Sequence, residues 1–311
     1  MPQLHQGTKV TMGSSNRPDS VRVPEVNGQT QVFAVFGYPV EHSLSPTIHN
    51  ASIAFLGLNY IYIPFTVKPD HLDSAIRIIN PLGIRGINLT VPHKERAIAC
   101  LDWISPEAKA VGAVNTIHPV DGELKGYNTD GEGFLRSLND TGLSFKGSHV
   151  LVLGAGGASR SVVYRLVKEG ARVTIANRTV ERAEELALRI SRILDSDKID
   201  CVRFQDVGKI TEMMEAAELV VNTTTLGMHP DMDSMPPIPP ESFHSGMLAY
   251  DLIYNPYETR FLRCAREAGA KTLNGLEMLI QQGAVAFQIW TQREPSVEAM
   301  REAAKRKMGV P

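Results

Sequence analysis

The chain has 311 residues, which exceeds the length of most single domains, so two domains are expected. Its composition, 43% hydrophobic and 21% charged, is typical of a globular protein. The 32 Lys and Arg residues against 34 Asp and Glu residues leave a formal net charge of −2. There is therefore no overall basic field to hold a nucleic acid or an anionic membrane.

Targeting and metal-binding signals are also lacking in the sequence. Residues 1–30 are polar, with no apolar core and no helical or strand period, so we expect a flexible tail, not a signal peptide. Cys100, Cys201 and Cys264 lie far apart with no metal-binding spacing, which predicts free thiols and no metal site. We expect a cytoplasmic monomer or homodimer that binds a small molecule, neither a nucleic acid nor a membrane.

From residue 32, short apolar runs alternate with amphipathic segments, which predicts strand, helix, strand, helix and strand. These segments span residues 32–37, 45–57, 59–67, 69–80 and 86–91. A hairpin is predicted over residues 113–127, because Asp121-Gly122 can adopt the positive φ angles of a tight turn.

A second series of alternating strands and helices runs from residue 149 to residue 274. Such alternation implies parallel strands joined by helical crossovers, as in a doubly wound Rossmann sheet. The helical segment 275–290 comes after that sheet is complete, so we expect it to return to the first domain. Five prolines within residues 230–240 predict a surface loop.

The stretch "VLVLGAGGASR" places three glycines directly after an apolar strand and at the start of a helix. Small residues there let the backbone approach a pyrophosphate, whose charge the helix-start N–H groups favour. A bare turn would also use glycine, but the strand-loop-helix context favours a dinucleotide site. The expected cofactor loop comprises Gly154, Ala155, Gly156, Gly157 and Ala158.

The end of the next predicted strand is where an NAD-specific sheet presents an acidic residue to the ribose. The residues at this position are instead Asn177, Arg178 and Thr179. The planar fork of Arg178 suits a 2′-phosphate, which predicts NADP as the cofactor. Arg182 lies one helical turn later and could contact the same phosphate, or it could pair with Glu181 or Glu185 on a solvated surface.

Four polar stretches, "EHSLSP", "NLTVPHK", "AVNT" and "GYNTDGEGF", stand at strand ends or helix starts. They offer the hydroxyl, amide and carboxylate groups that a small polyhydroxylated substrate needs. Followed in order by "GAGGASR", "NRT" and "GLEMLIQQGA", they closely resemble the shikimate dehydrogenase family. The resemblance covers about residues 32–290, and seven separate motifs agree in order and spacing.

This resemblance implies a reversible, NADP-dependent reduction of 3-dehydroshikimate to shikimate in aromatic amino acid biosynthesis. It implies an α/β fold with an N-terminal substrate-binding domain (residues 31–128), completed by C-terminal helices (275–311), and an NADP-binding Rossmann domain (129–274). By motif match, Ser43 and Ser45 would hold the substrate carboxylate, and Tyr254 would close the site. The side chains that would meet the ring hydroxyls are Thr90, Lys94, Asn115, Asp130 and Gln282.

Reduction of a ketone needs a proton donor within hydrogen-bonding reach, and the resemblance makes Lys94 the candidate. Val91-Pro92 is expected to end a strand and start a helix, because proline cannot donate to a sheet but fits the first helical turn. Lys94 would then project from the helix start, oriented by Asp130, while Asn88 would only support the loop.

Each of these residues also has a purely structural explanation. Lys94 could be an exposed surface lysine, and Asp130 or Ser45 could cap a helix. Asn115 could satisfy a turn. Thr90 could be an ordinary strand residue, and Tyr254 could be a packing aromatic.

The burial of Gln282 is predicted by its neighbours in the sequence, independently of the resemblance. In a helix over residues 275–290 it lies in an otherwise apolar row, so its amide needs a buried partner. Gln281 lies on a polar row with Glu277 and is expected to face water.

Three other functions share parts of this pattern. A glutamyl-tRNA reductase has a similar glycine loop but needs a nucleophilic cysteine, whereas Cys100 lies in the segment "RAIACLDWI", expected to be an apolar helix. A non-catalytic NADP-binding regulator would not require Lys94 and Asp130. A quinate/shikimate dehydrogenase of broader specificity is the third alternative.

Overall fold

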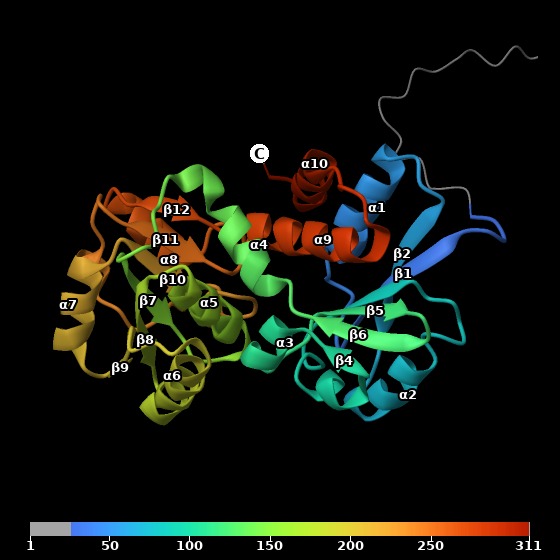
Figure 1. Ribbon diagram of the computed structural model, residues 1–311. Coiled ribbons are helices and arrows are strands. Elements are labelled where there is room, and N and C mark those ends of the chain that lie inside the picture. Colours follow the sequence, from blue (N-terminus) through green and yellow to red (C-terminus); the bar gives the residue numbers. More distant parts are fainter. Residues whose placement is uncertain (1–25, 311) are drawn as a thin grey trace, which may run out of the picture.

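The computed structural model of the protein describes residues 26–310, which form two sheets with helices packed around them (Figure 1). Residues 26–30 form a turn in which the Thr30 hydroxyl donates to Asn59 Oδ1 at 2.7 Å. The rest of the expected tail, residues 1–25, lies outside the described residues. Within residues 26–310, no helix has the length and apolarity needed to cross a bilayer.

The first sheet has the strand order β2-β1-β3-β5-β6-β4. Its strands are β1 (Gln31–Gly37), β2 (Tyr60–Thr66), β3 (Gly86–Leu89), β4 (Trp103–Ile104), β5 (Thr116–Val120) and β6 (Glu123–Tyr127). β1, β2 and β3 are parallel, whereas β5 is antiparallel to both β3 and β6. The predicted hairpin is confirmed, since Asp121 (φ 52°) and Gly122 (φ 86°) join β5 to β6.

Helices cover both faces of this sheet, because its central strands are apolar on both sides. In β1, Phe33 and Val35 belong to one buried cluster, while Ala34 and Phe36 belong to another on the opposite face. The helices of this region are α1 (Ser45–Phe55), η1 (Pro69–His71), α2 (Leu72–Arg77), η2 (Arg96–Cys100) and α3 (Pro106–Val111).

The second sheet is entirely parallel, with the strand order β12-β11-β10-β7-β8-β9. This order reverses at β7 and confirms the predicted doubly wound sheet. Its strands are β7 (His149–Leu153), β8 (Arg172–Asn177), β9 (Ile199–Arg203), β10 (Leu219–Asn222), β11 (Leu248–Asp251) and β12 (Lys271–Leu273). Alternate residues of β7, Val150 and Leu151, face separate cores on the two sides.

The helices of this sheet are η3 (Asn139–Thr141), α5 (Gly157–Lys168), α6 (Val180–Leu194), α7 (Val207–Ala216), η4 (Pro240–Ser242) and α8 (Arg260–Glu267). As expected, the proline-rich segment has no regular element before η4. A long loop therefore joins β10 to η4 at the edge of the molecule.

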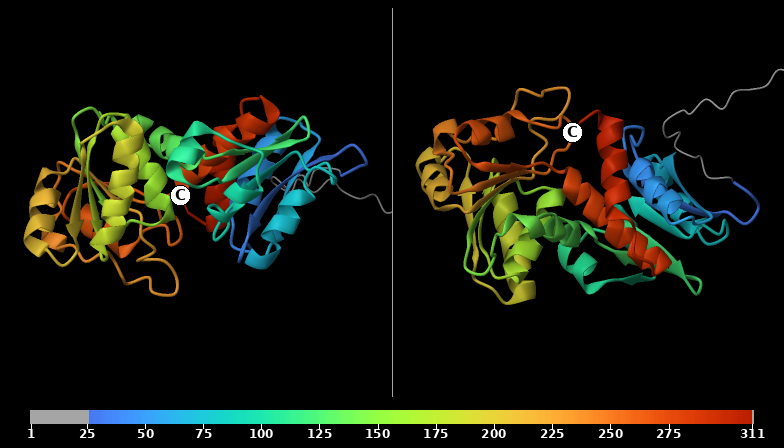
Figure 2. Two further views of the ribbon diagram at one scale, coloured as in Figure 1. Left: turned by 60° about the horizontal axis from the view of Figure 1, so that its bottom comes forward. Right: turned by 90° about the horizontal axis from the view of Figure 1, so that it is seen from above.

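Three helices, α4 (Asp130–Ser137), α9 (Leu276–Thr291) and α10 (Val297–Met308), complete the fold. In Figures 1 and 2, α4 and α9 run side by side between the two sheets, and α10 lies next to α1. Phe287 and Trp290 of α9 belong to the same hydrophobic cluster as Phe33 of the first sheet. Met278 of α9 belongs to a hydrophobic cluster on one face of the second sheet. α9 therefore contributes to the cores of both sheets.

The close approach of α4 to α9 requires a glycine. A Cβ atom added to Gly133 would lie 2.6 Å from the backbone nitrogen of Gln282, far inside van der Waals contact. The backbone of α9 cannot give way as a flexible side chain could.

We expect Gly133→Ala to lower the denaturation midpoint. Overpacking costs about 1–3 kcal/mol, which exceeds the gain of about 1 kcal/mol from replacing a helical glycine with alanine. Urea denaturation followed by circular dichroism measures this effect. The matched control is Gly208→Ala in α7, where an added Cβ meets no atom within 4 Å, so its midpoint should stay or rise. An unchanged midpoint in Gly133→Ala would contradict the proposed packing constraint.

Candidate active site

A cavity of about 220 Å³ lies between the first sheet, α9 and the segments that follow β11 and β12 of the second sheet. Seven of the eight catalytic and substrate-binding candidates line this one cavity, although they come from widely separated parts of the sequence. Those seven are Ser45, Thr90, Lys94, Asn115, Asp130, Tyr254 and Gln282. Ser43 lines an adjacent cavity, which Tyr254 also borders.

Lys94 and Asp130 form an ion pair in this cavity, with Lys94 Nζ donating to Asp130 Oδ2 at 2.6 Å. The side chain of Lys94 is 32% exposed and that of Asp130 is 12% exposed. This arrangement excludes the alternative that Lys94 is merely an exposed surface lysine. A charge-assisted bond of this kind fixes the ammonium at the cavity wall.

The expected helix start beside Lys94 is wrong. After β3 the chain makes turns through residues 91–95, and a short 3₁₀ helix begins only at Arg96. Long-range bonds hold these turns, since the Val114 amide donates to the Lys94 carbonyl at 2.8 Å and His93 Nε2 lies 2.8 Å from the Val67 carbonyl. Tertiary contacts, not a helix, therefore position the lysine.

Asp130 is the first residue of α4, but its side chain does not cap that helix. The N-cap is Thr129, and no side-chain capping bond forms there. Asp130 Oδ1 instead accepts from Asn115 Nδ2 at 2.8 Å, and Oδ2 accepts from Lys94. Both carboxylate oxygens are thus directed toward cavity residues.

The side chain of Asn115 is at the centre of this network. Its Oδ1 accepts from the backbone amide of Thr129 at 2.8 Å and from the Thr116 hydroxyl at 2.9 Å. These donors fix the amide so that Nδ2 faces Asp130 Oδ1, with Gln282 Oε1 at 3.4 Å. Asn115 therefore does more than satisfy a turn.

Gln282 is buried, as its apolar neighbours predict, and its amide has partners. Nε2 donates to the Leu279 carbonyl at 2.7 Å, and Oε1 faces Asn115. Gln281 is expected to face water, but its side chain is half-buried. Its Nε2 donates to Glu277 Oε1 at 2.7 Å.

The two serines occupy different positions. Ser45 begins α1, is buried and makes no capping bond, so the capping explanation does not hold. Ser43 Oγ accepts from the Ser45 amide at 3.2 Å. Thr90 follows β3, where its amide donates to the Phe36 carbonyl, and its side chain borders the cavity.

Tyr254 is partly a packing aromatic, since it contacts the cluster that contains Phe33 and Val35. It also lies between the two cavities. Burial raises the pKa of its phenol, so the hydroxyl stays protonated and can donate a hydrogen bond.

Asn88 also lines the cavity, although the sequence argument gave it only a supporting role. It lies on β3 two residues before Thr90, and side chains two apart in an extended chain share a face. This two-residue spacing from Thr90 is the sequence signal that predicts Asn88 at the cavity.

The glycine loop lies between β7 and α5, as the sequence predicts. Gly154 has φ +107°, and an added Cβ would lie 2.9 Å from Thr223 Oγ1, so only glycine fits without strain. Gly156 is the N-cap of α5 and Gly157 is its first residue. Both are exposed, and an added Cβ atom would meet no atom within 4 Å at either position. This helix start offers free N–H groups to an anion.

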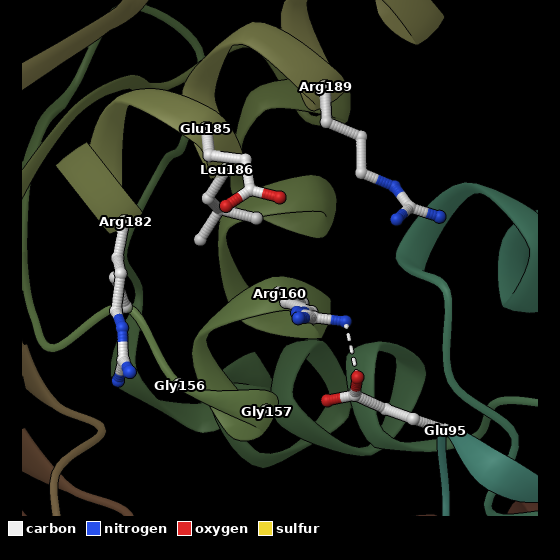
Figure 3. A pocket seen from close by; sticks show the side chains of 9 residues that line it. Glu95, Gly156, Gly157, Arg160, Arg182, Glu185, Leu186 and Arg189 are labelled. Atoms are coloured by element: carbon white, nitrogen blue, oxygen red, sulfur yellow. Dashed lines mark ion pairs between the residues drawn. The ribbon is translucent and has the colours of Figure 1, made fainter.

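A second cavity, of about 360 Å³, opens over this loop. Figure 3 shows Arg182 extending from α6 toward the loop. Arg160, on α5, lines the same cavity. Among the described residues Arg182 forms no ion pair, while Glu181 pairs with Arg203 at 2.6 Å. The alternative of a surface pair with either neighbouring glutamate is therefore not observed.

The residues after β8 lie at the surface near this cavity. Asn177 Nδ2 donates to the Thr179 carbonyl at 2.8 Å, which shapes the turn before α6. Arg178 and Thr179 are exposed, and neither borders the cavity over the loop. Ala155 borders that cavity, whereas Ala158 borders the first one.

An ion pair crosses between the two halves of the molecule at the rim of this cavity, as Figure 3 shows. Glu95 Oε2 lies 3.3 Å from Arg160 Nη1. Glu95 follows Lys94 directly, so one dipeptide borders both cavities. Sequence reasoning missed this pair because its members are 65 positions apart.

Cys100 does not have the properties of a nucleophile. It lies in a 3₁₀ helix, not in the longer apolar helix that was expected, and borders none of the three cavities described above. Burial raises the pKa of its thiol, which disfavours the reactive thiolate. The glutamyl-tRNA reductase alternative is therefore not supported.

Three segments of the chain match described families. Residues 35–117 match the shikimate dehydrogenase substrate binding domain, residues 137–229 match shikimate / quinate 5-dehydrogenase, and residues 275–305 match the shikimate 5′-dehydrogenase C-terminal domain. The shikimate dehydrogenase (NADP⁺) of Methanosarcina mazei is 47% identical over 275 residues, covering 88% of this chain and 96% of the relative. That of Moorella thermoacetica is 47% identical over 288 residues, covering 92% and 96%.

Solved structures agree with these matches. A shikimate dehydrogenase in complex with NADP⁺ has a TM-score of 0.86 and 42% identity, covering 91% of this chain and 97% of that one. The Thermus thermophilus enzyme in complex with NADP(H) and shikimate has a TM-score of 0.79 and 42% identity, covering 89% and 99%. The chain therefore belongs to the shikimate dehydrogenase family.

Proposed function

We infer that this protein is an NADP-dependent shikimate dehydrogenase, which interconverts shikimate and 3-dehydroshikimate in aromatic amino acid biosynthesis. The observation that carries this inference is the Lys94–Asp130 ion pair in a cavity bordered by the first sheet, by α9 and by segments that follow strands of the second sheet. Ala158 of the glycine loop borders the same cavity, so a cofactor held by the loop would adjoin a substrate there. The names of the relatives support the same activity.

The chemistry follows from the ion pair. NADP, when bound, supplies the hydride acceptor for oxidation of an alcohol. With the cofactor bound, Lys94 Nζ would accept the hydroxyl proton of shikimate during oxidation and would return that proton to the developing alkoxide during reduction. Asp130 holds the resulting ammonium through its charge-assisted bond and keeps Nζ beside the reacting oxygen.

Substrate binding is assigned to the small polar side chains around the cavity. Ser43 and Ser45 take the carboxylate, and Tyr254, between the two cavities, closes the mouth. The ring hydroxyls are bound by Thr90, Asn115 and Gln282, together with Lys94 and Asp130.

The cofactor site is assigned to the second sheet. The pyrophosphate lies against the loop of residues 154–158 at the start of α5. Arg178 and Arg182 take the 2′-phosphate, with Asn177 and Thr179 shaping the turn that presents them. The absence of an acidic residue at the end of β8 favours NADP over NAD.

We propose domain boundaries that follow the two sheets. We assign residues 31–128 and 275–311 to a substrate-binding domain and residues 129–274 to an NADP-binding domain. The first sheet with α9 and α10 supports the former, and the parallel second sheet supports the latter.

The first test is turnover of shikimate and quinate, each with NADP and NAD, followed by absorbance at the nicotinamide band. We expect the highest kcat/KM for shikimate with NADP. Quinate carries an additional hydroxyl on the carbon that bears the carboxylate, and that group would have to be desolvated beside the buried Ser45. Comparable kcat/KM for the two acids would favour the broader specificity, and no turnover would favour a regulator.

We expect Lys94→Ala to lower kcat by roughly 10²- to 10⁴-fold, the usual contribution of a positioned acid or base. NADP binding, measured by fluorescence titration, should survive because the phosphates are assigned to the other domain. Lys271→Ala, at an exposed site on β12, is the control and should keep its kcat. Near-normal kcat in Lys94→Ala would remove the proposed mechanism.

Asp130→Asn extends the same test to the partner of the lysine. It should also depress kcat, because the ammonium loses its charged acceptor. The double variant should be little slower than Lys94→Ala alone, since residues that act as a unit are not additive. A double variant whose loss equals the product of the two single losses would show independent roles.

We expect Arg178→Ala to weaken NADP binding by about 1.5–3 kcal/mol, the value of a hydrogen bond to a charged group. NAD has no 2′-phosphate, so kcat/KM with NAD should change little and the NADP-to-NAD ratio should fall. Arg192→Ala, exposed in the last turn of α6, is the matched control. An unchanged ratio in Arg178→Ala would refute the assignment of this arginine.

A further inference from the structure

The amide of Asn88 presents only its oxygen to a ligand in the first cavity. Its Nδ2 donates to the Asn115 carbonyl at 3.2 Å and to the Thr116 hydroxyl at 3.1 Å, which uses both amide hydrogens. Its Oδ1 accepts from the Tyr62 hydroxyl at 2.8 Å. An amide oxygen accepts two hydrogen bonds, so Asn88 retains capacity for one donor.

Tyr62, which is 1% exposed and does not border the cavity, is held rigidly behind Asn88. Its ring stacks on His49, with centroids 4.2 Å apart and planes 3° from parallel. Its backbone is fixed at the edge of the sheet by Asn50, whose side chain accepts from the Tyr62 amide and donates to the Tyr62 carbonyl. The phenol therefore has little freedom to move.

The His49 ring keeps its position because three elements surround it. It projects from α1 onto β2, and a Cβ atom added to Gly283 of α9 would lie 3.3 Å from His49 Nε2. Burial lowers the pKa of His49 to about 3, so the ring stays neutral near pH 7. The stack therefore contains no buried charge near neutral pH.

We propose that Tyr62 is a positioning residue for substrate binding: its hydroxyl holds the Asn88 amide so that Oδ1 can accept a substrate hydroxyl. This inference rests on the proposed function and deepens it. Without the phenol hydroxyl, the oxygen side of the amide loses its hydrogen bond at 2.8 Å. The His49 ring lies beside this amide, but neither of its nitrogens forms a hydrogen bond that could replace the lost one. The acceptors on the nitrogen side then supply the remaining hydrogen bonds that restrain the amide. A less restrained amide binds the substrate hydroxyl more weakly.

Tyr62→Phe deletes one oxygen atom and tests the proposal. At saturating NADP, which also stabilises the folded protein, the KM for shikimate should rise roughly 3- to 10-fold, the effect of one neutral hydrogen bond. The kcat should stay within about twofold, because Lys94 and Asp130 are untouched. NADP affinity should not change.

Tyr250→Phe is the matched control. Tyr250 is also completely buried, stacks on Phe134 and shares a hydrogen bond with the Ser137 hydroxyl at 2.7 Å, but it does not border the cavity. Tyr250→Phe removes the same hydroxyl group from an equally buried side chain, so its KM for shikimate should equal that of the wild type. An equal rise of KM in both variants would mean general loosening of the protein and would overturn the proposal.

A double-mutant cycle with Asn88→Ala separates positioning from any other effect of Tyr62. If Tyr62 acts through the amide, adding Tyr62→Phe to Asn88→Ala should leave KM unchanged. An unchanged KM in Tyr62→Phe alone would show that the Asn115 carbonyl and the Thr116 hydroxyl suffice to orient the amide. That result would overturn this inference while leaving the proposed function intact. Absence of shikimate turnover in the wild type would instead overturn the proposed function, and with it this inference.

Discussion

The buried side-chain amide of Asn115 is the interaction on which the arrangement of the cavity depends. Its oxygen is occupied by donors from Thr129 and Thr116, so its nitrogen must face Asp130 and Gln282. One amide thereby joins β5, α4 and α9. Because a buried polar group without a partner costs about 1–3 kcal/mol, this network defines one arrangement of the cavity wall. It also leaves the second oxygen of Asp130 for the lysine.

Two close backbone contacts around α9 also hold this cavity in shape. Gly133 lets α4 lie against α9, and a Cβ atom added to Gly275 would lie 1.9 Å from the Leu252 carbonyl oxygen. Gly275 and Leu252 both border the cavity. Backbone atoms cannot rotate away as side chains can, so these glycines set how closely α9 lies to α4 and to the segment after β11.

Features that depend on neighbouring residues could be read from the sequence alone. The doubly wound sheet follows from alternating apolar and amphipathic segments, and the hairpin follows from Asp121-Gly122. The apolar row around Gln282 predicted its burial, and the strand-loop-helix context predicted the glycine loop at Gly154. Spacing alone did not distinguish Lys94 from a surface lysine, and that assignment needed the family resemblance. Each successful prediction used residues within a few turns of one another.

Only the tertiary structure decided the surroundings of Lys94. The predicted helix after Val91-Pro92 is wrong, because proline fits a turn as well as a first helical turn, and distant contacts with Val67 and Val114 hold the chain there. The Glu95–Arg160 pair and the stack behind Asn88 likewise join residues far apart in sequence. Local pattern encodes which face of a segment is buried, but which groups meet across elements is set by packing, so the site's geometry existed only once the chain had folded.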